Sequence, residues 1–164
     1  MPFVSPKKSL GQNFLRDENI AKKIIDAVNP KTEDVLLEIG SGHGVLTKYI
    51  FNKAKHFLAF EIDKRVIEEL QEKFSTPNTE FFLQDFLEAD LLSIRKKYSS
   101  LLRIVGNIPY NITSPILFKL FDEEEKLVSS DDEVLDVETE VETEVEGWDK
   151  DIKDRKSTRL NSSH

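Results

Sequence analysis

The stretch VLLEIGSGHGVLT, residues Val35–Thr47, decides the fold of this chain. It begins with the apolar run Val35–Ile39, whose length and aliphatic content are typical of a strand buried on both faces of a parallel sheet. A turn follows in which Gly40, Gly42 and Gly44 permit backbone conformations that other residues resist, and they let a ligand approach the main chain. Apolar residues then recur at helical spacing. A strand, a glycine turn and a helix form the first half of a nucleotide-binding unit.

The spacing of the glycines distinguishes between nucleotide ligands. The dinucleotide fingerprint requires glycine at its first, third and sixth positions, but the sixth position counted from Gly40 is Val45. The sequence also contains no GxxxxGKS or GxxxxGKT phosphate loop, so the pattern argues against both NAD and ATP. A second apolar run, Phe57–Ile62, contains Glu61 near its end, about 20 residues after the first glycine, where an acid accepts hydrogen bonds from ribose hydroxyls. Together these features favour an adenosine ligand without a pyrophosphate, and S-adenosylmethionine fits that description. The alternative is that the glycines form an ordinary tight turn and that Glu61 is merely solvated, with no ligand site.

Charge is distributed unevenly along the 164 residues. Residues 1–128 have a net charge of −1, residues 129–153 have −9 and residues 154–164 have +2, so the total of −8 comes from one short segment and does not exclude a nucleic-acid partner. The sequence has no cysteine, no apolar run near the ~18 residues of a membrane span, and no apolar segment of a signal peptide in its first nine residues. We therefore expect a cytoplasmic protein without disulfides or a thiolate metal site.

Helices and strands are predicted to alternate along the chain. A helix should run from the cap Asp17 to Asn29, with Ile20 on its apolar face, and a later helix should be capped by Thr113 or Ser114 with Pro115 in its first turn. Residues 86–94 are predicted to form a loop and a helical turn. Further helices are predicted after Gly44 and over 64–74, and strands are predicted at 35–39, 57–62, 80–84 and 101–106. The alternation predicts a parallel α/β sheet with right-handed crossovers.

Polar residues or glycine stand at the carboxyl end of each predicted strand. These are Gly40, Glu61, Asp85 and Asn107. Because the carboxyl ends of parallel strands meet at one edge of an open sheet, these residues should line one crevice. Acids and asparagine also end strands as turn formers, but polar residues or glycine at four successive strand ends favour a site.

Five segments in order resemble the rRNA adenine dimethyltransferases, namely KKSLGQNFL, EIGSGHGVLT, FEID, QDFLEAD and GNIPYNITSP. The resemblance extends from about Ser5 to Phe121. It implies a Rossmann-like fold that uses S-adenosylmethionine to dimethylate the exocyclic amine of adenines in ribosomal RNA. KKSLGQNFL and the continuation NITSPI favour the small-subunit rRNA type. For that type we expect a monomeric enzyme whose partner is the small ribosomal subunit.

The resemblance also implies the residues that bind the cofactor. Asn13 and Leu15 would fold over its methionine end, and Gly40 with its loop would lie behind the amino-acid part. Glu61 would hold the ribose hydroxyls and Asp85 the adenine amine. Asn107 would lie at the boundary between cofactor and target. The full set is Asn13, Leu15, Gly40, Gly42, Glu61, Asp85 and Asn107.

The catalytic residues implied by the resemblance are Asn107, Pro109 and Tyr110. An adenine amine is a poor nucleophile, because its lone pair is delocalised into the ring. Acceptors at Asn107 Oδ1 and at the carbonyl of Ile108 or Pro109 can bind its protons, and Pro109 stiffens the backbone that places them. Tyr110 offers a face for stacking of the flipped base, with a buried tyrosine in a proline turn as the alternative. Positioning suffices for this chemistry, so no metal is expected.

Two residues of the glycine turn differ in what they imply. Ser41 stands where the family usually has proline, and serine can adopt the same backbone conformation. His43 lies at a variable position of the loop. We predict a solvent-facing His43 rather than a catalytic one, because the sequence offers it no evident partner.

The family pattern is expected to end at about Asp122, so the chain is expected to be the amino-terminal fragment of a longer protein, truncated after the fourth strand and its following helix. The fourth strand would then lie at a sheet edge. We predict four segments. Residues 1–16 form a lid and residues 17–128 a partial methyltransferase domain. Residues 129–153 form an acidic, low-complexity segment that is expected to be disordered, and residues 154–164 form a separate last segment. The last segment, DRKSTRLNSSH, reads as a translated sequencing adapter and is excluded from fold reasoning.

Two other functions remain open at this point. One is a large-subunit rRNA adenine methyltransferase of the macrolide-resistance type, which shares most of these motifs. The other is a non-catalytic relative that binds RNA or transcription machinery. An intact NIPY sequence argues against the second.

Overall fold

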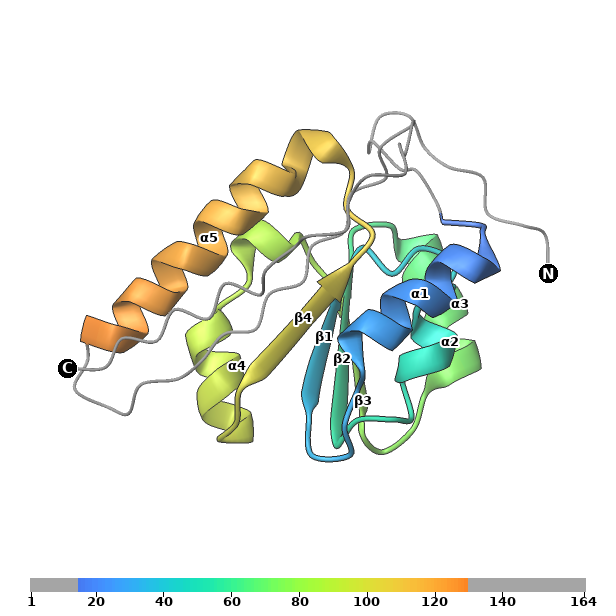
Figure 1. The fold of residues 1–164 in the computed structure, drawn as a ribbon, viewed down its shortest axis with the longest axis horizontal. Helices are drawn as coiled ribbons and strands as arrows, with labels where there is room; N and C mark the ends of the chain where they lie inside the picture. The colour runs from blue at the N-terminus through green and yellow to red at the C-terminus, as the bar shows by residue number, and fades with distance from the viewer. Residues whose placement is uncertain (1–14, 130–164) are drawn as a thin grey trace.

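A parallel sheet with the strand order β3-β2-β1-β4 lies at the centre of the computed structural model, which describes residues 15–129 (Figure 1). The predicted parallel α/β sheet is confirmed, and each strand lies within one residue of its predicted bounds. The strands are β1 (Val35–Ile39), β2 (His56–Glu61), β3 (Thr79–Leu83) and β4 (Leu102–Gly106). Within the described residues β4 forms one edge of the sheet, as expected.

Helices cover both faces of the sheet (Figure 1). Their bounds are α1 (Glu18–Val28), α2 (Thr47–Ile50), α3 (Lys64–Phe74), the short 3-10 helix η2 (Phe86–Glu88), α4 (Leu91–Tyr98) and α5 (Tyr110–Ser129). Because side chains alternate along a strand, Leu36 packs with α1 and α2 on one face, whereas Leu37 packs with η2, α4 and α5 on the other. The sheet is therefore the middle layer of three, and β1 is buried along its whole length.

The first helix follows its sequence signals at both ends. Asp17 caps α1 by accepting hydrogen bonds from the backbone N–H groups of Asn19 and Ile20, and Asn29 ends the helix in the left-handed conformation. The prediction that Ile20 lies on the buried face is wrong, since its side chain is 37% exposed. Ala21 takes that place, one turn before Ile24 and Ile25.

Two later helices differ from the prediction. A full helix, α4, occupies Leu91–Tyr98, where a loop and a single turn are expected; Asp90 caps it through Ser93. Its charged last turn obscures the apolar spacing in the sequence. The caps predicted at Thr113 or Ser114 are also wrong. The helix α5 begins at Tyr110 and contains Pro115 in its second turn, where the missing N–H removes only one backbone bond.

The chain termini lie mostly outside the described residues. Of the predicted lid at 1–16, only Leu15 and Arg16 are described. Of the acidic segment at 129–153, only Ser129 is described, and the adapter-like segment lies wholly outside the described residues. Among the helices of residues 15–129, none is both long and apolar enough to cross a membrane.

An arginine on β4 connects the sheet to the end of α1. The guanidinium of Arg103 donates to the carbonyls of Val28 and Asn29 and pairs with the carboxylate of Asp34. The side chains of Arg103 and Asp34 are only 18% and 11% exposed, so solvent screens the pair weakly. The contact fixes the start of β1 and the end of α1 against the edge strand.

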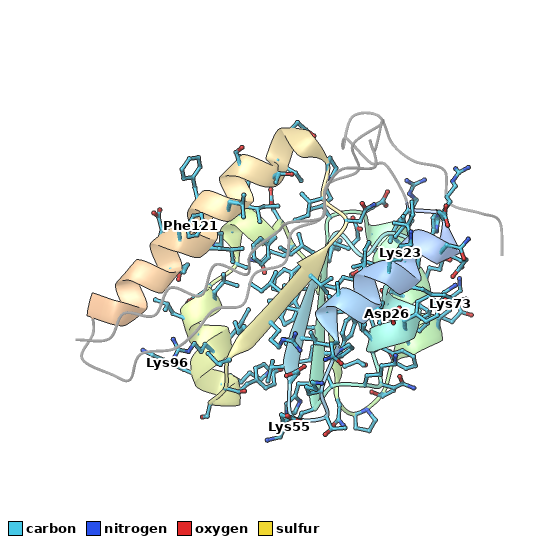
Figure 2. All side chains as sticks on the ribbon, viewed as in Figure 1. Lys23, Asp26, Lys55, Lys73, Lys96 and Phe121 are labelled. Atoms are coloured by element: carbon cyan, nitrogen blue, oxygen red, sulfur yellow. The ribbon has the colours of Figure 1, made fainter. Side chains whose placement is uncertain are left out.

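Replacing this arginine tests the connection. Arg103→Met should lower the free energy of unfolding by about 1.5–3 kcal/mol, because it removes charge-assisted hydrogen bonds to largely buried acceptors. Urea denaturation of the chain measures the change. Lys55→Met, which alters an exposed cation near the same end of the sheet (Figure 2), is the control and should change stability by less than about 0.5 kcal/mol. Equal effects of the two substitutions would contradict the structural role of Arg103.

Candidate functional site

The carboxyl ends of the four described strands surround a cavity of about 170 Å³. Gly40 follows β1, Glu61 ends β2, Asp85 follows β3 and Asn107 follows β4, and all of them line this cavity together with Pro109. The predicted crevice is therefore present. A second, smaller cavity adjoins it, since Gly40 and Asn107 line both. The smaller cavity is also lined by Leu15, Glu38, Ser41, Gly42 and His43.

The glycine turn depends on backbone conformations that favour glycine. Gly40 has a φ of 67° with open space around the position of a Cβ atom, so the main chain there is uncovered toward the cavity side. Gly44 has a φ of 78°, and a Cβ atom on it would lie 2.6 Å from Cε2 of Phe74 and 3.0 Å from Cδ2 of Leu70. The turn therefore lies directly on α3, and Gly44 is needed for that close approach.

Glu61 is held in place by backbone N–H groups. Its Oε2 atom accepts a hydrogen bond from Gly42 (3.1 Å), and its Oε1 atom accepts from Ile62 (2.8 Å) and Asp63 (3.1 Å). The side chain is 5% exposed, so the alternative of a merely solvated Glu61 is wrong. A carboxylate has about four acceptor positions, and these three bonds leave capacity for a further donor.

The walls of the larger cavity are mostly apolar. Ile62, Leu87 and Ile112 line it although 45%, 37% and 37% of their surfaces are exposed. Phe60 and Phe86 also line it, and both are almost fully buried. Apolar walls with a few polar groups at strand ends suit a flat heteroaromatic ring that carries a polar edge. Asp85 supplies one such group, and its Oδ1 atom accepts from the backbone N–H of Leu87 (2.9 Å).

The backbone after β4 distinguishes between the two carbonyls predicted to bind a target amine. The carbonyl of Pro109 accepts hydrogen bonds from the N–H of Ile112 (3.1 Å) and from the hydroxyl of Thr113 (3.1 Å). Both lone pairs of that oxygen are thereby engaged. The carbonyl of Ile108 is therefore the better candidate. The side chain of Tyr110 and the whole of Asn13 are outside what the structure describes, so their roles stay predictions.

Glu38 is a buried acid that the sequence analysis did not single out. Its side chain is 1% exposed, and its Oε2 atom accepts a hydrogen bond from the hydroxyl of Thr47 (2.6 Å). Burial raises the pKa of Glu38 to about 8, and the nearby carboxylate of Glu61 acts in the same direction. An acid inside the aliphatic run VLLEI was the available signal. Glu38 also lines the smaller cavity.

His43 does not face solvent, contrary to the prediction. Its side chain is 10% exposed, and its Nδ1 atom lies 3.1 Å from Oε2 of Glu69 on α3. The close packing of Gly44 on α3 brings the ring to this carboxylate. Within residues 15–129, no group of three or more acidic, histidine or cysteine side chains could hold a metal ion.

Comparison with known proteins identifies the family of the chain. The family model described as "Ribosomal RNA adenine dimethylase" matches residues 4–143. The chain belongs to this family. The match to the rRNA adenine dimethylases continues past Phe121, where the resemblance was expected to end.

The curated relatives include small-subunit enzymes by name. The chain is 42% identical over 127 residues to "Ribosomal RNA small subunit methyltransferase A" of Francisella tularensis subsp. novicida, an alignment that covers 76% of this chain and 48% of the relative. The chain thus spans about half the length of the curated relatives that it matches.

Two solved structures share both sequence and fold with the chain. The 23S rRNA methyltransferase ErmE is 35% identical with a TM-score of 0.57, over 65% of this chain and 42% of ErmE. A dimethyladenosine transferase from Plasmodium falciparum is 32% identical with a TM-score of 0.58, over 67% of this chain and 38% of that protein. A Rossmann-like methyltransferase fold is therefore confirmed for the described part of this rRNA adenine dimethylase chain.

The raised pKa of Glu38 predicts how stability depends on pH. Between the ordinary value of 4.5 and about 8, the native state keeps a proton that the unfolded state releases. The free energy of unfolding should therefore fall as pH rises through this window, by up to about 1.4 kcal/mol per pH unit from this group. Glu38→Gln, which keeps an acceptor for Thr47, should remove that component. Urea denaturation of both proteins at several pH values between 5.5 and 8.5 isolates it as a difference, and parallel pH profiles would contradict the assignment.

Proposed function

We propose that this chain is the cofactor-binding part of an enzyme that transfers methyl groups from S-adenosylmethionine to the exocyclic amines of adenines in small-subunit rRNA. The observation that supports this most directly is the cavity shared by Glu61, Asp85 and Asn107 at the carboxyl ends of β2, β3 and β4. The resulting product would be dimethyladenine in the small ribosomal subunit. The proposal includes a cytoplasmic location and a monomeric enzyme.

The residues of the site fit an adenosine ligand with a methionine tail. Glu61 is buried with acceptor capacity for ribose hydroxyls, and the apolar walls with Asp85 at one side suit an adenine ring and its amine. The backbone at Gly40 carries no Cβ atom and lies between the two cavities, so the amino-acid tail would pass along it toward Leu15. When bound, S-adenosylmethionine supplies an electrophilic methyl group on a sulfonium centre.

The chain's own residues would act on the target amine by position and hydrogen bonding. Asn107 Oδ1 and the carbonyl of Ile108 would accept the two amine protons and so favour the pyramidal nitrogen, which is the nucleophilic form. Thr113 supports this assignment, because its hydroxyl engages the neighbouring carbonyl of Pro109. Holding nucleophile and electrophile in line accounts for most of the rate enhancement available to such a site.

The comparison with ErmE favours one second candidate, methylation of large-subunit rRNA. Methyl transfer by the full-length gene product to unmethylated small ribosomal subunits, with large subunits in a parallel reaction, tests the two. Transfer to the small subunit alone supports the proposal. Transfer to the large subunit alone supports the second candidate, and transfer to neither, with intact cofactor binding, supports a non-catalytic relative.

The cofactor assignment predicts a large effect at Glu61. Glu61→Ala should weaken S-adenosylmethionine binding by about 1.5–3 kcal/mol, because it removes hydrogen bonds to a charged acceptor. Isothermal titration calorimetry measures the change, and Glu33→Ala, an exposed carboxylate before β1 at the other end of the sheet, is the control that should bind as the parent does. Unchanged affinity in Glu61→Ala would remove Glu61 from the site, and tight NAD binding by the parent would overturn the cofactor assignment.

The target-base assignment predicts a contrast at Tyr110. Tyr110→Ala should reduce methyl transfer while leaving the cofactor affinity unchanged, because the lost stacking surface is worth roughly 1–3 kcal/mol per base. Tyr110→Phe keeps the ring and should have a mild effect. Single-turnover methylation of rRNA by the full-length gene product measures both. If phenylalanine were as damaging as alanine, the hydroxyl rather than the ring face would be the important group.

A further inference from the structure

The tip of the glycine turn is held from two sides. On the cavity side, the N–H of Gly42 donates to Oε2 of Glu61, the atom pair that joins the ends of β1 and β2. On the other side, Gly44 packs against Leu70 and Phe74 of α3. His43 lies between these two glycines, and its ring reaches the carboxylate of Glu69 on the same helix.

Glu69 is a firm anchor for the histidine ring. Its side chain is 17% exposed, and its other oxygen is bound by the ammonium of Lys73. Burial alone would raise the pKa of Glu69, but the hydrogen bonds from Lys73 and His43 outweigh burial and hold the pKa below its ordinary value. Glu69 is therefore an anion at neutral pH. Because an ionised carboxylate only accepts hydrogen bonds, Nδ1 of His43 is the donor.

This contact bears on ligand binding because the carboxylate of Glu61, which holds the other side of the turn through Gly42, is also the group proposed to bind the ligand. Oε2 of Glu61 accepts from Gly42, and the remaining acceptor capacity of the carboxylate is available to a ribose hydroxyl, so the ligand and the glycine turn bind the same side chain. His43 lines the smaller cavity, but its contact with Glu69 lies outside the larger cavity, so that contact persists when a hydroxyl binds Glu61. It keeps the turn, and with it Gly40, in the conformation that receives the ligand.

We propose that His43 and Glu69 form a latch that holds the glycine turn on α3 and thereby sets the affinity for the cofactor. His43 is thus a positioning residue, not a catalytic one, and it acts through the backbone of Gly42 and Gly44. The inference rests on the proposed S-adenosylmethionine site for its effect on affinity. The latch itself is a contact between two side chains of the chain and does not depend on that site.

Hydrogen exchange on the chain tests the latch without any ligand. The informative amides are those of Gly42 and Gly44, which donate to Glu61 Oε2 and to the carbonyl of Ser41. His43→Ala should accelerate their exchange about tenfold and leave the amides of β1 unchanged. His43→Asn, whose side-chain amide can donate from nearly the position of Nδ1, should restore slow exchange. If His43 contributed only to global stability, His43→Ala would instead accelerate exchange throughout the sheet, and His43→Asn would not restore slow exchange at the two glycines alone.

A double-mutant cycle identifies Glu69 as the partner. Glu69→Ala and the double variant should each accelerate exchange at the two glycines as much as His43→Ala does, because the second change removes nothing further. Glu72→Ala, an exposed carboxylate on the same helix, is the matched control and should match the parent. Additive effects of the two single substitutions, or parent-like exchange in His43→Ala, would overturn the latch.

Calorimetry with S-adenosylmethionine then connects the latch to function. His43→Ala should bind the cofactor about tenfold more weakly, whereas His43→Asn and Glu72→Ala should bind it as the parent does. In the full-length gene product, His43→Ala should raise the KM for the cofactor without changing kcat. A parent chain that does not bind S-adenosylmethionine would contradict the proposed function, while the exchange experiment would still decide the latch. A parent that binds and a His43→Ala variant with unchanged affinity would overturn the role in affinity and leave the proposed function standing.

Discussion

The hydrogen bond from the N–H of Gly42 to the carboxylate of Glu61 joins the ends of the two central strands, and the site is built around it. The same carboxylate accepts from Ile62 and Asp63, so it fixes the turn after β2 as well as the turn after β1. A buried carboxylate without such donors would be strongly destabilising. The binding group and the backbone around it are thus stabilised by the same three bonds.

Much of the fold and part of the site could be predicted because they depend on short-range patterns. Strands buried on both faces give continuous apolar runs, and the acids lie at or just after the carboxyl ends of these runs, so Glu61 and Asp85 could be found by counting. The cap at Asp17 and the stop at Asn29 are likewise local signals.

The features that escaped prediction depend on contacts between distant segments. His43 and Glu69 are 26 positions apart, and no local pattern indicates that α3 passes beneath the glycine turn. The pKa of Glu38 depends on complete burial by elements on both sides of β1, which a sequence does not display. Helix α5 begins earlier than its apparent caps. The N–H of Ile112 and the hydroxyl of Thr113 both donate to the carbonyl of Pro109, so Thr113 lies inside the first turn and its hydroxyl binds a carbonyl rather than capping N–H groups.

The register of the sheet has a consequence for how the site is assembled. Val35 pairs with His56 of β2 on one side and with Leu102 of β4 on the other, so the second pairing closes a much longer loop. The entropic penalty of loop closure grows with loop length, and joining β4 to β1 is therefore the less favourable of the two steps. Pairing of β4 with β1 brings Asn107 into the site, whereas the shorter closure of β2 onto β1 brings Glu61 there. A ligand that bridges these two residues binds only the fully paired sheet, so its binding energy adds to the stability of the longest-range pairing.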